Sequence, residues 1–199
     1  SDVDSKYKKQ SGGHGQYGHV KMRFEASGDL ETPYVFEEEV VGGAVPKNYF
    51  PAVEKGLQEA VVKGPLAGYP VVGVKAVLYD GSYHPVDSSE MAFKKGFMEA
   101  SPVLLEPIAS LTVTIPDDYT GDIMGDLNKR RGRVLGMNPV SGGRQEIVAD
   151  IPMTGLFGYC TVLRSMTGGR GVYSYEFARY EQAPSDVQEA EIAKRAKEE

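Results

Sequence analysis

Alternating apolar and polar residues in the first half of the chain predict strands. Val20-Lys21-Met22-Arg23-Phe24 is the clearest case, because every second side chain is apolar, as in a strand with one buried face. On this pattern the first half is expected to hold three strands, at 19–25, 34–41 and 71–79.

Helical spacing takes over between the second and third of these strands. Val53, Leu57, Ala60 and Val61 recur on one helical face after Pro46, and Gly64-Pro65 marks the end of the helix. A further helix is expected at about 88–100, where Asp87 and Glu90 form a capping box.

The second half has the element order β-α-β-β-α-β. We expect strands at 111–115 and 172–177 and a hairpin of 134–140 and 145–151 between them. A first helix follows Pro116 and carries Ile123, Met124 and Leu127 on one face. A second helix follows the hairpin and carries Leu156, Phe157, Cys160 and Leu163. This order is typical of the ferredoxin-like fold, with two helices on one face of an antiparallel sheet. After Pro184, a charged helix is expected, with Ser185 and Gln188 at its start.

Composition places the chain among ordinary globular proteins. Its 199 residues allow one or two domains, 41% are hydrophobic, and the formal net charge is -6. The single cysteine, Cys160, fits a reducing compartment and is interpreted as a small core residue. No apolar stretch approaches the ~18 residues of a membrane span, so we expect a cytoplasmic monomer that binds no membrane.

A glycine-rich run, Ser11–Val20, is the most unusual segment. Within it, Gly13–Gly18 satisfies G-x-G-x-x-G, the dinucleotide fingerprint, which works only between a strand and a helix. Here the preceding Ser5–Gln10 is polar and basic, and a strand follows. We therefore predict a mobile loop whose few side chains let a partner's backbone approach closely.

Other catalytic motifs are absent from the sequence. No Gly-Lys dipeptide occurs, so there is no P-loop, and no Cys pair or H-E-x-x-H motif indicates a metal site. Ser82, His84 and Asp87 lie on one loop without a nucleophile elbow. We expect no catalytic residue, no metal and no cofactor in this chain; a small nucleotide-binding or hydrolytic enzyme is the alternative from another class.

Several sequence blocks in one order resemble a single family, the C-terminal portion of bacterial translation elongation factor G. The blocks are Lys8–Gly13 with Gly15–Val20, Val41-Gly42-Gly43 with Val45-Pro46-Lys47, Leu66–Val72, Leu78–His84 with Val86–Phe93, Pro102–Pro107, Gly125–Asn128 and Arg131-Gly132. The resemblance covers about residues 5–184.

The resemblance implies an α+β protein of two domains. A ribosomal-protein-S5-like β-α-β domain over 1–104 would correspond to the family's fourth domain. A ferredoxin-like βαββαβ domain over 105–184 would correspond to its fifth, followed by a charged helical tail over 185–199. The family is a GTP-driven ribosomal translocase, so GTP and Mg²⁺ would belong to N-terminal domains outside this chain, and the partners would be the ribosome, tRNA and mRNA.

Two segments would form the leading tip of the fourth domain in the small-subunit decoding region. By motif they are Ser11, Gly12, Gly13, His14, Gly15, Gln16, Tyr17 and Gly18 in the first segment, and Gly81, Ser82, Tyr83 and His84 in the second. Gln16 would bond a base edge or ribose, and Tyr17 would stack on a base or be a half-buried strand residue. From the residues alone, the first segment is equally an ordinary connection and His84 a solvated histidine. His19 is expected to be structural.

Basic residues of the second half would contact large-subunit rRNA at the factor-binding site. The candidates are Lys129, Arg130, Arg131, Arg133 and Arg170. The alternative is structural, because cations at a helix C-terminus are favourable to its dipole, and the Thr167–Gly171 segment with Arg170 is equally a tight turn.

Two departures from the family pattern leave a specialised paralogue open. His14 stands where the family usually has arginine, so a paralogue acting in ribosome recycling or protection is the alternative to the main translocase. After Lys94 the family's helix typically continues for about eight more residues, close to two turns.

Overall fold

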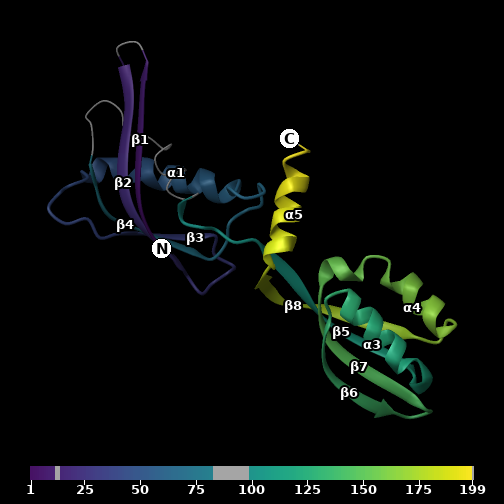
Figure 1. Cartoon of the computed structure of the whole chain (residues 1–199). Coiled ribbons are helices and arrows are strands. Elements are labelled where there is room, and N and C mark those ends of the chain that lie inside the picture. The colour runs from purple at the N-terminus through teal and green to yellow at the C-terminus, as the bar shows by residue number, and fades with distance from the viewer. Residues whose placement is uncertain (12–13, 83–98, 199) are drawn as a thin grey trace. The chain divides into compact units, whose positions relative to one another are not determined.

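The computed structural model describes residues 1–11, 14–82 and 99–198. Most of the helix predicted at about 88–100 lies outside these ranges. The chain divides into two compact units, one formed by 1–103 together with 185–199 and the other by 104–184. Each unit is built around its own sheet (Figure 1).

The first unit has a four-stranded sheet in the order β1-β2-β4-β3. Its strands are β1 (Asp2–Ser11), β2 (His14–Ala26), β3 (Tyr34–Glu38) and β4 (Val74–Ser82). β1 and β4 flank β2 in antiparallel pairing, whereas β3 and β4 are parallel. The predicted strands at 19–25, 34–41 and 71–79 are therefore present, but β4 begins only after Gly73, whose φ of +68° ends the preceding turn.

The prediction of a glycine-rich loop over the first tip segment was wrong. Ser11 is the last residue of β1, and His14–Gly18 are the first residues of β2, so the segment is the end of a β-hairpin. β1 escaped detection because it is an edge strand with few apolar residues. Of its described side chains only Val3 and Ser5 are buried.

One helix covers the core face of this sheet. A 3-10 turn at Lys47–Tyr49 leads into α1 (Phe50–Val62), which carries Pro51 in its first turn, where proline is tolerated. The core contains Met22 and Phe24 of β2, Leu78 of β4 and Leu57 of α1. Because the core and α1 cover one face of β2 and β4, the opposite face is the one that remains open.

The second unit confirms the predicted ferredoxin-like order. Its strands β5 (Leu105–Pro116), β6 (Arg133–Val140), β7 (Arg144–Pro152) and β8 (Val172–Gln182) form an antiparallel sheet in the order β6-β7-β5-β8. Two helices, α3 (Thr120–Lys129) and α4 (Tyr159–Thr167), pack on one face of the sheet (Figure 1). 3-10 turns at Asp117–Tyr119 and Met153–Leu156 precede the two helices.

The start of α4 differs from the sequence prediction. Leu156 ends the 3-10 turn and Phe157 is 82% exposed, whereas Tyr159 is fully buried. Gly158 adopts φ +67° between them, which separates the 3-10 turn from α4. The helix therefore begins three residues later than the spacing of Leu156 and Cys160 indicated.

The charged tail is helical, as predicted. α5 (Ser185–Arg195) belongs to the first unit, where Tyr69 holds it through two contacts. The Tyr69 hydroxyl donates to the Glu191 carboxylate at 2.7 Å, and the Arg195 guanidinium lies 4.3 Å from the Tyr69 ring centroid. The hydrogen bond from Tyr69 lowers the pKa of Glu191.

Candidate functional site

The hairpin that carries the first predicted tip segment extends beyond its sheet. Among the described residues, β2 pairs with β4 as far as His19, opposite Ser82, whereas its pairing with β1 continues to His14, opposite Ser11. The five residues 14–18 of β2 thus lie beyond the β4 ladder, a length of about 17 Å for a strand. Figure 1 shows the hairpin projecting past α1 and the other strands of its unit.

The register gives most tip residues a defined backbone position. Gln16 lies opposite Lys9, Tyr17 opposite Lys8, and Gly15 opposite Gln10. Gly12 and Gly13 lie outside the described residues, as do Tyr83 and His84 of the second segment.

The second tip segment leaves the sheet beside the base of this hairpin. Gly81 lies opposite Val20, and a Cβ at position 81 would come within 2.6 Å of the His19 carbonyl oxygen and 2.8 Å of the Val45 side chain. Glycine is therefore required for the close approach of the two strands. The structure thus brings the described ends of the two predicted tip segments together.

A polar cluster joins three strands at the same place. The His19 ring bonds through Nδ1 to the Ser82 hydroxyl at 2.8 Å and through Nε2 to Asp4 Oδ1 at 2.6 Å. His19 was expected to be structural, as it is, and Asp4 was not among the predicted site residues. Only the strand register, which places Ser82 opposite His19, could have linked them.

Ion pairs continue along the face of the sheet that lies away from α1. Lys21 meets Asp80 at 2.8 Å, and their hydrogen bond lowers the pKa of Asp80 and raises that of Lys21. On the same sheet Lys75 meets Glu37 at 2.9 Å.

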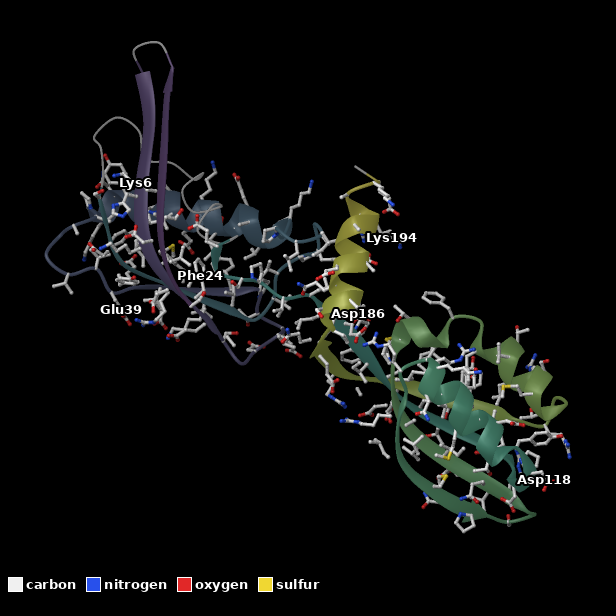
Figure 2. The ribbon with its side chains drawn as sticks, viewed as in Figure 1. Lys6, Phe24, Glu39, Asp118, Asp186 and Lys194 are labelled. Carbon is white, nitrogen blue, oxygen red and sulfur yellow. The ribbon has the colours of Figure 1, made fainter. Side chains whose placement is uncertain are left out.

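Arg23 meets Glu39, which is labelled in Figure 2, at 3.2 Å. These pairs connect β2 to β4, β4 to β3, and β2 to the residue that follows β3.

In the second unit, two predicted rRNA-binding arginines have internal partners. Arg130 donates to Asp126 at 2.8 Å and to the Gly155 carbonyl oxygen at 2.7 Å, and its guanidinium lies 5.1 Å from the Tyr159 ring centroid. Arg131, at φ +64°, makes a bidentate pair with Glu106, which is 8% exposed. These contacts give both side chains a structural role.

Arg133 shares a carboxylate with an arginine from another strand. It meets Asp150 of β7 at 3.0 Å, and Arg179 of β8 meets the same oxygen at 2.7 Å. Burial alone would raise the pKa of Asp150, but hydrogen bonds from Arg179 and Arg133 outweigh it and lower that pKa. Asp150 therefore remains ionised and ties the two edge strands β6 and β8 to β7.

The two remaining basic candidates differ in their surroundings. Arg170 donates to the Thr167 carbonyl oxygen at 3.3 Å and to the Tyr119 hydroxyl, with its guanidinium 5.1 Å from the Tyr119 ring centroid. Lys129 is exposed in the last turn of α3. Of the five candidates, Lys129 and the 68%-exposed Arg133 side chain are the more open to a phosphate.

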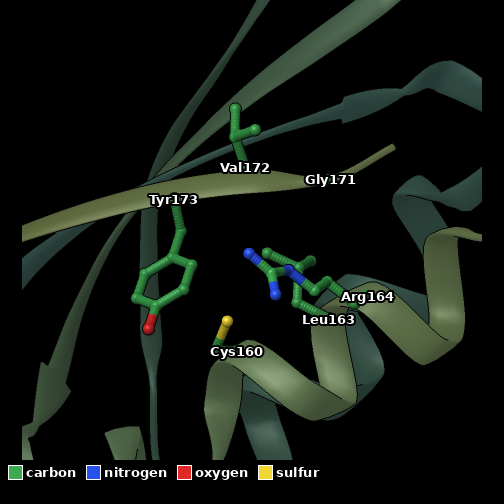
Figure 3. A pocket seen from close by; sticks show the side chains of 6 residues that line it. All are labelled: Cys160, Leu163, Arg164, Gly171, Val172 and Tyr173. Atoms are coloured by element: carbon green, nitrogen blue, oxygen red, sulfur yellow. The ribbon is translucent and has the colours of Figure 1, made fainter. Parts of the chain in front are cut away.

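A small hollow lies between α4 and β8 (Figure 3). Its volume is about 150 Å³, and it is lined by Cys160, Leu163, Arg164, Gly171, Val172 and Tyr173. Pockets that hold drug-sized ligands usually measure about 300–1,000 Å³, so this hollow does not fit a nucleotide. Cys160 is half-buried at its edge rather than fully enclosed in the core.

Neither a metal site nor a membrane span occurs in the described part of the chain. Across residues 1–11, 14–82 and 99–198, no three His, Cys, Asp or Glu side chains are grouped so that they could hold a metal ion. No described helix combines the length and the apolar character needed to cross a membrane.

Comparison with known proteins assigns both units. Residues 1–101 match the family described as "Elongation factor G, domain IV", and residues 103–191 match "Elongation factor G C-terminus". A crystal structure of a protein from Thermus thermophilus is 44% identical, with a TM-score of 0.70, and the match covers 100% of this chain and 30% of that one. The chain therefore belongs to the elongation factor G family, with the family's domain IV over residues 1–101 and its C-terminal region over 103–191.

Proposed function

We propose that this chain is the ribosome-binding part of a GTP-dependent translocase that moves tRNA and mRNA. In this mechanism the end of the β1–β2 hairpin and the segment that begins at Gly81 enter the decoding region of the small subunit and block the return of the tRNA–mRNA duplex. The observation that carries the proposal is the projection of the hairpin beyond the described part of its own sheet, past the last described residue of β4.

The hairpin has the dimensions and composition for such a role. It extends about 17 Å past the β4 ladder, a length sufficient to pass between nucleic-acid backbones without the bulk of the domain. Its sequence there contains Gly12, Gly13, Gly15 and Gly18, which reduce its width, and Lys8 and Lys9, whose charge favours a phosphate-rich partner.

The rest of the first unit supports the hairpin mechanically. α1 closes the core on one face of the sheet, and ion pairs connect β2, β4 and β3 on the other. Each exposed pair contributes little by itself, but together the pairs resist shear between strands. The hairpin base is therefore suited to transmit force.

The second unit would anchor the domain on large-subunit rRNA. Lys129 and Arg133 are the described candidates most open to a phosphate, while Arg130, Arg131 and Arg170 are held by partners within the unit and would shape the surface around them. GTP and Mg²⁺ would be bound by another part of the longer protein, because the sequence has no P-loop motif.

Shortening the hairpin without changing its register tests the proposal. Deleting Lys9 and Gln10 together with their partners Gln16 and Gly15 removes two residue pairs and leaves every remaining side chain on its original face. In the full-length factor, we expect translocation measured by rapid kinetics to slow by at least about tenfold, because misplacement of a contacting group by even 1 Å is costly. GTP hydrolysis on the ribosome should remain near its normal rate.

A variant of unchanged length is the control. Lys9→Ser, Gln10→Ser and Gln16→Ser keep the backbone reach, so most of the translocation rate should remain. Normal translocation by the shortened factor would contradict the proposal. An equal loss in both variants would assign the effect to these side chains rather than to reach.

A further inference from the structure

His19 connects the strands from which both predicted tip segments leave the sheet. It lies on β2 immediately after Gly18, and its ring contacts Ser82 at the end of β4 and Asp4 on β1. His19 lies directly opposite Ser82, and Asp4, which pairs with Lys21, is its diagonal neighbour on β1. One side chain thus fixes three strands at one level of the sheet.

The partners determine the hydrogen atoms of this cluster. The ionised Asp4 carboxylate only accepts, so His19 Nε2 carries a hydrogen and donates it. In the tautomer that carries its hydrogen on Nε2, Nδ1 accepts and the Ser82 hydroxyl donates to it. The Asp4 carboxylate on β1 therefore orients the Ser82 hydroxyl on β4 through the His19 ring between them.

The environment of the cluster favours positioning over catalysis. In a catalytic Ser-His-Asp triad the carboxylate is buried, whereas the Asp4 side chain is 61% exposed. Ser82 is the last described residue of β4, and the sequence around it, Asp80-Gly81-Ser82-Tyr83-His84, lacks the G-x-S-x-G pattern of a nucleophile elbow. The His19 side chain itself is only 19% exposed, which restrains its ring.

Other charged groups surround the cluster on the same face. Lys6 of β1 lies opposite His19, and Lys21 of β2 and Asp80 of β4 form an ion pair one step along the ladder. The Lys21–Asp80 pair connects β2 and β4 without involving Ser82, which makes it a matched control for cross-strand contacts.

We propose that His19 is a positioning residue, which holds Ser82 and thereby fixes the described start of the second tip segment, Gly81 and Ser82, relative to the base of the hairpin. The inference rests on the proposed function for its effect on translocation, but the geometry can be tested in the chain alone. It predicts that the His19–Ser82 contact contributes more to tip function than the neighbouring Lys21–Asp80 pair does.

Two amide variants separate the two contacts of the ring. The amide nitrogen of asparagine takes the position of Nδ1 and reaches Ser82, whose hydroxyl then accepts instead of donating, whereas that of glutamine takes the position of Nε2 and donates to Asp4. In the full-length factor we expect His19→Gln and Ser82→Ala each to slow translocation by about fivefold, the effect of one lost hydrogen bond. The double variant should be no slower than either single variant. His19→Asn and Lys21→Met should stay within about twofold of the unmodified factor.

A spectroscopic measurement on the 199-residue chain checks the geometry without the ribosome. The ¹⁵N resonances of the neutral His19 ring should identify Nε2 as protonated, and Ser82→Ala should shift the Nδ1 resonance while leaving the fold intact. Protonation on Nδ1, or no response to Ser82→Ala, would overturn the inference.

The outcomes distinguish this inference from the proposed function. If the shortened hairpin slows translocation but His19→Gln and Ser82→Ala do not, the inference fails and the function stands. If the ring assignments hold but the shortened hairpin translocates normally, the function fails and only the geometry stands.

Discussion

Tyr159 is a buried residue whose hydroxyl has no hydrogen-bond partner among the described residues. Its ring packs edge-on against the Tyr173 ring, with 5.1 Å between the ring centroids. The Arg130 guanidinium lies 5.1 Å from the centroid of the Tyr159 ring. Burial raises the pKa of this hydroxyl well above its ordinary value, so it is neutral at physiological pH. The ring therefore stabilises the second unit, while the hydroxyl carries an uncompensated desolvation cost.

Tyr159→Phe should leave the free energy of unfolding of the second unit unchanged or raise it by about 1 kcal/mol, because it removes only the unpaired hydroxyl. Tyr159→Leu removes the ring and should lower that free energy by at least about 1 kcal/mol. Urea denaturation of both variants provides the comparison. A clear loss of stability in Tyr159→Phe would show that the hydroxyl has a partner, such as an ordered water.

Lys129 and Arg131 are close in sequence but differ in their contacts. Lys129 is exposed, whereas Arg131 makes a bidentate pair with the buried Glu106. Lys129→Ala should therefore weaken ribosome binding without changing the melting temperature. The slope of log affinity against log salt concentration should fall by the amount that about one phosphate contact contributes.

Arg131→Ala should instead lower the melting temperature, because it leaves Glu106 buried without this partner. Binding measured across a salt series, together with thermal melts, separates the two effects. Equal losses of melting temperature would count against the distinction.

At the scale of elements, Asp150 holds the two edge strands of the second sheet to β7. Asp150→Asn should lower the free energy of unfolding of this unit by about 1–2 kcal/mol at pH 7, because two charge-assisted hydrogen bonds weaken while both arginines keep access to water. Glu181→Gln is the control, since Glu181 pairs with the same Arg179 at the surface and should contribute less than about 0.5 kcal/mol.

The pH dependence of this effect follows from the lowered pKa of Asp150. The stabilisation that the ionised Asp150 provides is fully present above the ordinary carboxyl pKa of 3.8. It is lost as the pH falls through the pKa of Asp150 in the folded state, which is lower. The difference between the unmodified chain and Asp150→Asn should therefore shrink below about pH 4 in denaturation curves. A difference that grows on acidification would contradict this account.

Elements with strong alternation could be predicted from the sequence, and those without it could not. β5 places Leu111, Val113 and Ile115 in the core with no exposed surface, so its pattern is unmistakable. β1 is an edge strand with mostly polar residues and is held by its ladder with β2, which no local pattern reveals.

The candidate site shows the same limit. Sequence motifs could suggest both predicted tip segments, because glycine-rich and Gly-Ser-Tyr-His runs are local features, and their role as a tip stays a prediction. The contact of His19 with Ser82 and Asp4 depends on the register of three strands, and residues 15 and 63 positions apart carry no local sign of pairing. The basic cluster was also visible in the sequence, but its internal ion pairs required the positions of Glu106 and Asp150.

At the scale of the whole molecule, the first unit is built from two separate stretches of chain. Residues 1–103 and the C-terminal stretch from Ser185 belong together, and Tyr69 secures α5 to the former. The second unit occupies the sequence between them. Its two ends lie side by side, because the Ala183 amide donates to the Leu104 carbonyl oxygen at 2.9 Å.

This adjacency makes the second unit an inserted domain in the topological sense. The chain enters it and leaves it through neighbouring residues, so its insertion costs the first unit little more than the closure of a short loop. Because the two ends of the inserted domain meet, this domain could also be circularly permuted. In evolution, the sequence of either unit could change without separating the two stretches of chain that form the first unit.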